Sequence, residues 1–270
     1  MVTVSDRTAV SVRFALLFRR LARCAAGRGD VARARMNFLA AVADDPTPAS
    51  SIEFAEFLTS NGHRQDGLLV LHDAWELAKR RGNGGEVAEC CRLIALAYRG
   101  AGNRHLAKRF AERAADAEML MWGVGDGTWS AAQLQLEALL ALDEREIGRA
   151  RSLAAAALEV CVDDVSRSGA MRRLAEIDRA GGRAVSAAKV LLEAARLARE
   201  AGEDRGYAEC VLQLGHTLRG MGRLPGAAAC YRVAAVRFEQ AGRRVEALRA
   251  RRWRSQTEAI ERSRRNAEWN

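Results

Sequence analysis

One spacing pattern recurs along most of the chain and strongly limits how it can fold. A small residue is followed seven positions later by Gly, and three further positions at steps of five, four and three are mostly small or apolar. Gly ends a helix by adopting a positive φ, and small residues let two helices approach closely. The pattern therefore predicts a series of helical hairpins. Its copies are Ala22, Gly29, Ala34, Phe38 and Ala41; Ala55, Gly62, Gly67, Leu71 and Ala74; Ala95, Gly102, Ala107, Ala111 and Ala114; Ala175, Gly182, Ala187, Leu191 and Ala194; and Gly215, Gly222, Ala227, Tyr231 and Ala234.

A sixth copy, weaker than the others, lies between the third and the fourth. It keeps the small residues Ala138, Ala150, Ala154 and Ala157, but Arg145 replaces the turn Gly. The composition agrees with helices, because there are only 3 Pro and 6% aromatic residues, whereas strands favour aromatic and β-branched side chains. We therefore predict an all-α fold in which Ala95, Ala107, Ala114 and Ala227 are buried between helices.

The repeated frame resembles the tetratricopeptide repeat over roughly residues 11–241. The best copies are LIALAYRGAGNRHLA, from Leu93 to Ala107, and LGHTLRGMGRLPGAAACYRVA, from Leu214 to Ala234. The spacing of the turn glycines, 33 and then 40 residues, is similar to that of the longer repeats found in bacterial regulators. The resemblance implies a right-handed α-solenoid of about six hairpins with a C-terminal capping helix.

The frame divides the chain into a repeat array, residues 1–242, and a basic C-terminal helix and tail, residues 243–270. Three Gly within five positions make residues 121–128 a candidate hinge, with a plain connector as the alternative. The C-terminal segment carries nine Arg and three Glu between residues 243 and 265. We expect it to cap the solenoid, with Leu248, Trp253 and Ile260 on its packing side. The alternatives are docking on an acidic partner or a second copy, and nucleic-acid binding.

No catalytic, cofactor or metal signature is present. The four His lie in distant segments, and no phosphate-binding loop, dinucleotide fingerprint or nucleophile elbow occurs. Cys90 and Cys91 are adjacent, so on a helix their side chains diverge by about 100° and make a poor metal pair. Asp163 and Asp164 are interpreted as a solvated helix end rather than an acid–base pair. We therefore predict a protein that is not an enzyme and that binds no cofactor or metal.

The resemblance implies a site for partners. In tetratricopeptide arrays the first helix of each hairpin lines the concave groove, and the frame then places ten residues of this chain there. The groove would be basic at both ends and apolar in the middle, and Arg suits a two-pronged grip on carboxylates. The Lys and Asn carboxylate clamp known from the family is missing, and a merely solvated Arg face is the alternative. The ten candidates are Arg19, Arg23, Arg92, Arg99, Leu139, Leu142, Arg172, Arg179, His216 and Arg219.

These features predict a cytoplasmic scaffold or adaptor that binds a protein or peptide with an acidic segment or a C-terminal carboxylate. The alternatives are a peptide- or ligand-sensing regulator that acts with a separate effector, and nucleic-acid binding through the Arg-rich end. No signal peptide or membrane-spanning segment is predicted, and a homo-oligomer is possible. Of 43 basic residues only Lys79, Lys108 and Lys189 are Lys, a bias typical of GC-rich bacterial genomes.

Overall fold

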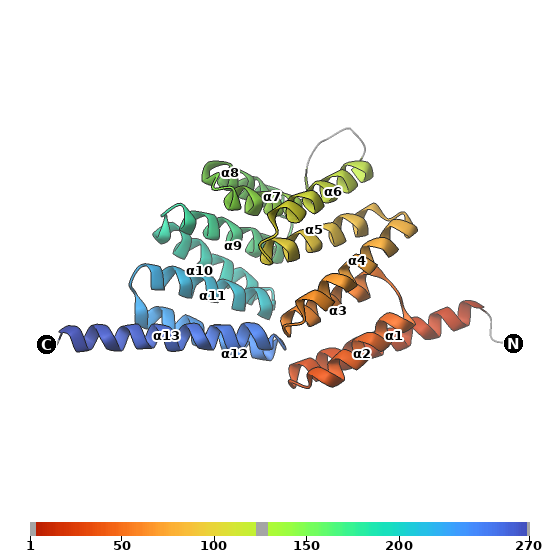
Figure 1. Cartoon of the computed structure of the whole chain (residues 1–270), viewed down its shortest axis with the longest axis horizontal. Helices are drawn as coiled ribbons and strands as arrows, with labels where there is room; N and C mark the ends of the chain where they lie inside the picture. The colour runs from red at the N-terminus through yellow and green to blue at the C-terminus, as the bar shows by residue number, and fades with distance from the viewer. Residues whose placement is uncertain (1–3, 123–128, 269–270) are drawn as a thin grey trace. The chain divides into compact units, whose positions relative to one another are not determined.

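The computed structural model describes residues 4–122 and 129–268, and within these ranges all secondary structure is helical (Figure 1). The chain divides into two compact units, residues 1–129 and residues 130–270. Most of the candidate hinge at 121–128 lies outside the described residues, and the boundary between the two units follows directly after it. The all-α prediction is confirmed for the described residues.

The first unit consists of three hairpins, and in each the first helix packs against the second. Successive hairpins also stack, because α2 packs on α3 and α4 packs on α5. The helices are α1 (Val4–Gly27), α2 (Val31–Asp44), α3 (Pro48–Ser60), α4 (Arg64–Arg81), α5 (Gly84–Gly100) and α6 (Arg104–Trp122).

The second unit continues with three hairpins and a further helix, which packs against α12. Its hairpins stack through contacts of α8 with α9 and of α10 with α11. The helices are α7 (Ala131–Asp143), α8 (Ile147–Glu159), α9 (Asp164–Ala180), α10 (Ala184–Glu200), α11 (Asp204–Gly220), α12 (Leu224–Gln240) and α13 (Arg244–Glu268).

The turn glycines have the backbone conformation that the frame requires. Gly29, Gly62, Gly102, Gly182 and Gly222 all have φ between 75° and 93°, a left-handed region that costs other residues energy. In the degraded fourth hairpin, Arg145 takes the same conformation with φ 65° and is the one described non-Gly residue that does so. The hairpin therefore keeps its turn geometry even where the sequence has lost the glycine.

The small residues of the frame lie where the helices meet. Ala95, Ala107, Ala114 and Ala227 are fully buried, as predicted. At Gly215 an added β-carbon would lie 2.8 Å from the ring of Tyr231, so only a residue without a side chain fits between α11 and α12. Close helix approach therefore explains why this frame position is always Ala or Gly.

The last helix corrects one prediction. α13 begins at Arg244, 40 residues after Asp204 of α11, so it starts where the first helix of a further hairpin would start. Its buried side is formed by Ala247, Ala250 and Thr257, with Trp253 half-buried beside them. Leu248 and Ile260 are exposed, so their assignment to the packing side is wrong. The reason is geometric: Leu248 is rotated about 100° from the buried Ala247.

Candidate partner-binding site

The first two groove candidates meet at a carboxylate of the next hairpin. Arg19 and Arg23 of α1 both bind Glu53 of α3, with N–O distances of 2.6 and 2.5 Å. Burial alone would raise the pKa of Glu53, but hydrogen bonds from Arg23 and Arg19 and their positive charges lower it overall. These two arginines are therefore both paired with Glu53 and join two hairpins.

Arg92 is likewise occupied inside the first unit. It binds Glu89 of its own helix at 2.8 Å and Glu118 of α6, and its side chain is largely buried. Arg99 lies seven residues further along α5 and is half-buried. The pair between Arg92 and Glu118 ties the two helices of one hairpin together, so Arg92 is not available to grip a partner without breaking that pair.

Leu139 is predicted to be an apolar anchor for a partner in the middle of the groove, and this prediction is wrong. The Leu139 side chain faces the interior of the unit and is buried, as are those of its neighbours Ala138 and Leu140 in α7. Leu142 is half-buried and packs against a cluster that includes Ala138, Ala150 and Ile177. Both residues therefore stabilise the fourth and fifth hairpins, and a partner could reach Leu139 only if the helices moved apart.

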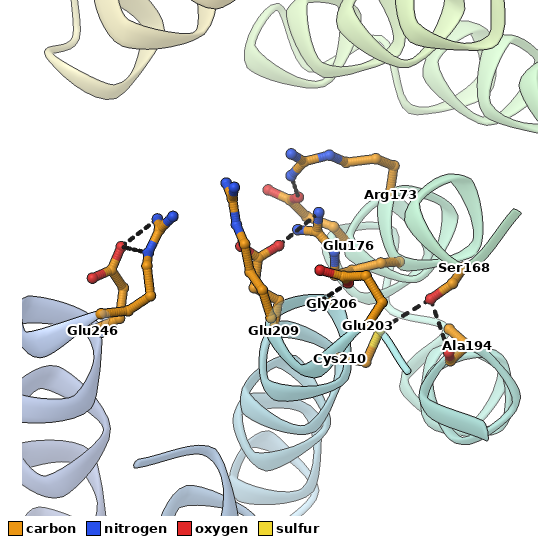
Figure 2. A network of polar contacts seen from close by, with 12 residues as sticks. Ser168, Arg173, Glu176, Ala194, Glu203, Gly206, Glu209, Cys210 and Glu246 are labelled. Atoms are coloured by element: carbon orange, nitrogen blue, oxygen red, sulfur yellow. Dashed lines mark hydrogen bonds and ion pairs between the residues drawn. The ribbon is translucent and has the colours of Figure 1, made fainter. Parts of the chain in front are cut away.

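In the second unit the face of the first helices carries a row of paired charges. Figure 2 shows Arg173 and Glu176 of α9, Glu209 of α11 and Glu246 of α13 on the same side of these helices. Glu209 is bound by Arg172 at 2.9 Å and by Arg205 at 3.2 Å. Burial would raise the pKa of Glu209, but the charges of Arg172 and Arg205 outweigh it and lower the pKa to about 2. Arg172, another groove candidate, is therefore paired with a carboxylate of the protein, as Arg19, Arg23 and Arg92 are.

The three remaining candidates, Arg179, His216 and Arg219, come together at the other end of these helices. Arg219 and His216 both contact the ring of Trp253, and the positive charges of Arg179 and Arg219 both lower the pKa of His216. Arg179 and Arg219 are in the last turns of α9 and α11, where the helix dipole stabilises positive charge. Among the described residues, neither arginine forms an ion pair with a carboxylate. The positive charges of Arg179 and Arg219 are therefore not balanced by a carboxylate of the described residues.

Two aromatic residues that were not predicted to take part complete the cluster. The guanidinium of Arg219 lies 4.7 Å from the ring centroid of Trp253, a cation–π contact with α13. The Trp253 ring is also perpendicular to the His216 ring, at 5.2 Å between centroids. On the other side, the Tyr231 hydroxyl lies 2.9 Å from Nδ1 of His216. We call Arg179, His216, Arg219 and Trp253, with Tyr231 behind them, the basic aromatic site.

His216 is held neutral in this site. Burial lowers its pKa to about 4, and the charges of Arg179 and Arg219 lower it in the same direction. The Tyr231 hydroxyl and Nδ1 of His216 share a hydrogen bond in which either atom can be the donor. The site thus presents two guanidinium groups, which suit an anion.

The neutral His216 makes stability depend on pH. An unfolded His216 is protonated below about pH 6.5, whereas in the folded protein it stays neutral down to about pH 4, so the unfolded state binds more protons in between. Stability therefore falls as the pH is lowered through this window. We expect His216 to account for about 1–2 kcal/mol of the loss between pH 7.5 and pH 5, after allowance for its partial exposure.

The measurement is urea unfolding at both pH values for the parent and for His216→Asn, whose amide oxygen can accept the Tyr231 hydrogen bond. The variant should lose less stability on acidification by that amount, while His105→Asn, at an exposed position, should behave like the parent. Equal losses in all three proteins would contradict the neutral state of His216.

The remaining sequence features are the Asp163–Asp164 pair and the adjacent cysteines Cys90 and Cys91. Asp163 caps α9 by accepting a hydrogen bond from the backbone N–H of Ser166, which confirms its interpretation as a helix end. Burial raises the pKa of Cys90 to about 12 and that of Cys91 to about 11, so both thiols stay protonated and unreactive. Within residues 4–122 and 129–268, no group of three or more His, Cys, Asp or Glu is placed to hold a metal ion. No described helix has the length and apolar composition needed to cross a lipid bilayer.

Comparison with known proteins identifies the fold. No protein-family model and no curated protein sequence matches the chain. Among solved structures, it is similar to a STAND ATPase with a tetratricopeptide-repeat sensor from Pyrococcus horikoshii, at 15% identity over 94% of this chain with a TM-score of 0.56. It is also similar to the Cut9–Hcn1 hetero-tetramer of the APC/C, at 13% identity over 82% of this chain with a TM-score of 0.52. The chain covers only 40% and 39% of those two chains. It has the tetratricopeptide-repeat fold.

Proposed function

We propose that this protein is a non-catalytic scaffold or adaptor that binds an acidic segment or C-terminal carboxylate of a protein partner at the basic aromatic site. The observation that supports the proposal is the contrast among the groove arginines. Arg19, Arg23, Arg92 and Arg172 form ion pairs with Glu53, Glu118 and Glu209, whereas Arg179 and Arg219 have no carboxylate partner among the described residues. A carboxylate from outside the chain would complete the same type of pair.

The geometry favours an anion with a flat, forked shape. Each guanidinium can donate two parallel hydrogen bonds to one carboxylate, and the stacking of Arg219 on Trp253 holds one of them in place. The half-buried position of Arg219 and His216 reduces competition from water. A partly desolvated contact of this kind contributes about 1.5–3 kcal/mol, against less than about 1 kcal/mol for a fully exposed pair.

The fold supports a role in protein binding in a general way, since stacked hairpins present extended surfaces to partners. Six free cysteines, most of them buried, suit a reducing compartment, and we place the protein in the cytoplasm for that reason. A sensing regulator would use the same site but would pass the signal to a separate effector.

A peptide-binding experiment tests the proposal. The probe is a short fluorescein-labelled peptide rich in Asp and Glu, prepared with a free and with an amidated C-terminus, and binding is followed by fluorescence anisotropy. We expect the double variant Arg179→Ala/Arg219→Ala to bind about 10- to 100-fold more weakly and to stay folded, with only the small loss of stability that follows from losing the Arg219–Trp253 contact. The free and amidated peptides distinguish recognition of a C-terminus from recognition of an acidic stretch.

The matched control is Arg251→Ala/Arg254→Ala on α13, where both arginines are exposed and form surface ion pairs with Glu239 and Glu258. This change should alter binding less than about twofold. Loss of binding in the α13 variant with retention in the site variant would move the site to the basic C-terminal helix. Preference for a labelled oligonucleotide over the peptides, with a steep loss of affinity as salt rises, would support nucleic-acid binding instead.

A further inference from the structure

A pocket of about 480 Å³ lies in the second unit among α10, α11 and α12. The helices α10 and α12 both pack against α11, and small or medium-sized apolar side chains from all three helices line the space between them. Two lining residues, Leu192 and Arg199, are exposed, so the pocket is open to solvent. Its volume is in the range of clefts that bind small organic molecules. We call it the α10–α12 pocket.

The first unit contains the equivalent place, and the repeat frame identifies it. The packing residues of the third and sixth hairpins, Ala95 and Gly215, are 120 residues apart, as are the turn glycines Gly62 and Gly182. The helices α4, α5 and α6 begin at Arg64, Gly84 and Arg104, each 120 residues before the start of α10, α11 or α12. Every residue that lines the pocket therefore has a counterpart 120 positions earlier in the chain.

In the first unit this place is filled by an aromatic ring of the protein itself. The ring of Trp75 in α4 lies 5.5 Å from the ring of Phe110 in α6, and the guanidinium of Arg113 lies 5.1 Å from the Trp75 ring. The residues at the same positions of the second unit are all smaller, namely Ala195, Cys230 and Val233. The α10–α12 pocket is therefore the space that an indole ring and its neighbours occupy in the first unit.

The charges beside the two places differ as well. In the first unit, Nζ of Lys79 lies 3.9 Å from the centre of the Trp75 ring and 2.7 Å from a carboxylate oxygen of Glu76. In the second unit Arg199 takes the position of Lys79, and Arg196 takes the position of Glu76. Arg196 is already paired with two carboxylates of α10, whereas Arg199 has no ion pair in the part of the chain that the structure describes. Arg199 therefore lacks both the aromatic ring and the carboxylate that its counterpart contacts.

We propose that the α10–α12 pocket binds a small aromatic carboxylate, whose ring takes the place that Trp75 fills in the first unit and whose carboxylate pairs with Arg199. The charges are complementary, because a guanidinium attracts both a carboxylate and the negative face of an aromatic ring. The apolar walls remove the ring from water, and Tyr207 of α11, which replaces Val87, adds a further aromatic surface to the lining. This site goes beyond the proposed peptide binding and shares no residue with the basic aromatic site.

Isothermal titration calorimetry with indole-3-acetate tests the proposal, since this compound joins the ring of a Trp side chain to a carboxylate. We expect one molecule to bind per chain, with a dissociation constant on the order of 100 µM. Indole-3-acetamide lacks the charge and cyclohexaneacetate lacks the aromatic ring, so each should bind about 3- to 10-fold more weakly. A parent protein that binds none of these compounds, or all three equally, overturns the proposal.

The variant Ala195→Trp places in the pocket the residue that fills it in the first unit. We expect it to bind indole-3-acetate at least about tenfold more weakly and to keep the melting temperature of the parent, because the new ring enters existing space. The matched control is Ala155→Trp, the same change at an exposed position of α8, which should bind like the parent. Equal binding by Ala195→Trp and Ala155→Trp would place the ligand elsewhere and overturn the proposal.

The variant Arg199→Met tests the charge at an exposed position, where a substitution does not endanger the fold. It keeps most of the side-chain stem, so it should bind indole-3-acetate and indole-3-acetamide equally well. The control Arg232→Met, exposed on α12 and outside the pocket lining, should keep the preference of the parent for the carboxylate. A preference that survives in Arg199→Met would contradict the role of this arginine.

A last titration distinguishes a free compound from the side chain of a protein partner. The probe is a short acetylated and amidated peptide in which Trp is followed by Glu, and we expect it to bind more weakly than indole-3-acetate. Tighter binding of the peptide would make the pocket a site for an aromatic side chain of a partner and would overturn the assignment to a small molecule.

Discussion

Replacing Phe238 with Ala should lower the free energy of unfolding of the second unit by about 3–5 kcal/mol, the largest effect that we expect from one substitution. Phe238 is 1% exposed and belongs to the cluster that contains Ala247 and Ala250 of α13. Its ring fills the space between α12 and α13, and two helices held by several other contacts cannot close up around the cavity. The loss therefore combines the lost burial of the ring with an unfilled cavity.

The measurement is urea unfolding followed by circular dichroism, with Leu248→Ala as the matched control. Leu248 lies one residue from the buried Ala247 but is exposed, so its truncation should change stability by less than about 0.5 kcal/mol. The pair of variants also tests which side of α13 faces the core. A large loss for Leu248→Ala with a small one for Phe238→Ala would show that α13 is rotated from the position described here.

The hairpins could be predicted from the sequence because their determinants are local. A left-handed Gly and a small residue seven positions before it fix a turn and a close approach within one short segment, as Gly102 and Ala95 show. The second helix α2 is followed by Pro46 and has 14 residues. Of the second helices without a following Pro, α4, α6, α10 and α12 are longer, with 17 to 19 residues, and only α8 is shorter, with 13. These features depend on neighbours in the sequence, not on distant partners.

The charge state of the groove could not be predicted in the same way. Arg19 and Arg23 find Glu53 thirty or more residues away, and Arg92 finds Glu118 on the next helix. Spacing within one helix places an arginine on a face, but the carboxylate opposite depends on how two helices pack. Four of the seven predicted groove arginines are paired with carboxylates of other helices, and only the structure separates them from Arg179 and Arg219.

The register of α13 explains why Trp253 was assigned to packing alone. The repeated spacing pattern ends at Gly242, so it predicts no orientation for the helix that follows. In the structure α13 lies where the first helix of a further hairpin would lie, and Trp253 is beside Arg219 and His216 of α11, with ring contacts to both. Extending the 40-residue spacing by one more step would have placed α13 among the first helices.

Replacing Ala107 with Leu should destabilise the first unit by about 1–3 kcal/mol, because the site has no room for a larger side chain. Ala107 lies in the first turns of α6 and is fully buried where α6 packs against α5. The three added carbon atoms must push the two helices apart or distort the side chains around them. The same frame position is the fully buried Ala34, Ala187 and Ala227 in other hairpins, so the restriction belongs to the repeat.

The control for this substitution is Ala32→Leu in α2, which makes the same change at an exposed position of the same unit. Leu and Ala are both good helix formers, so this variant should stay within about 0.5 kcal/mol of the parent. Urea midpoints of the three proteins decide the matter. A tightly packed Ala cannot accept three extra carbon atoms without a cost in stability. If Ala107→Leu unfolds at the same urea midpoint as the parent, the small residues of the frame therefore do not set the helix spacing.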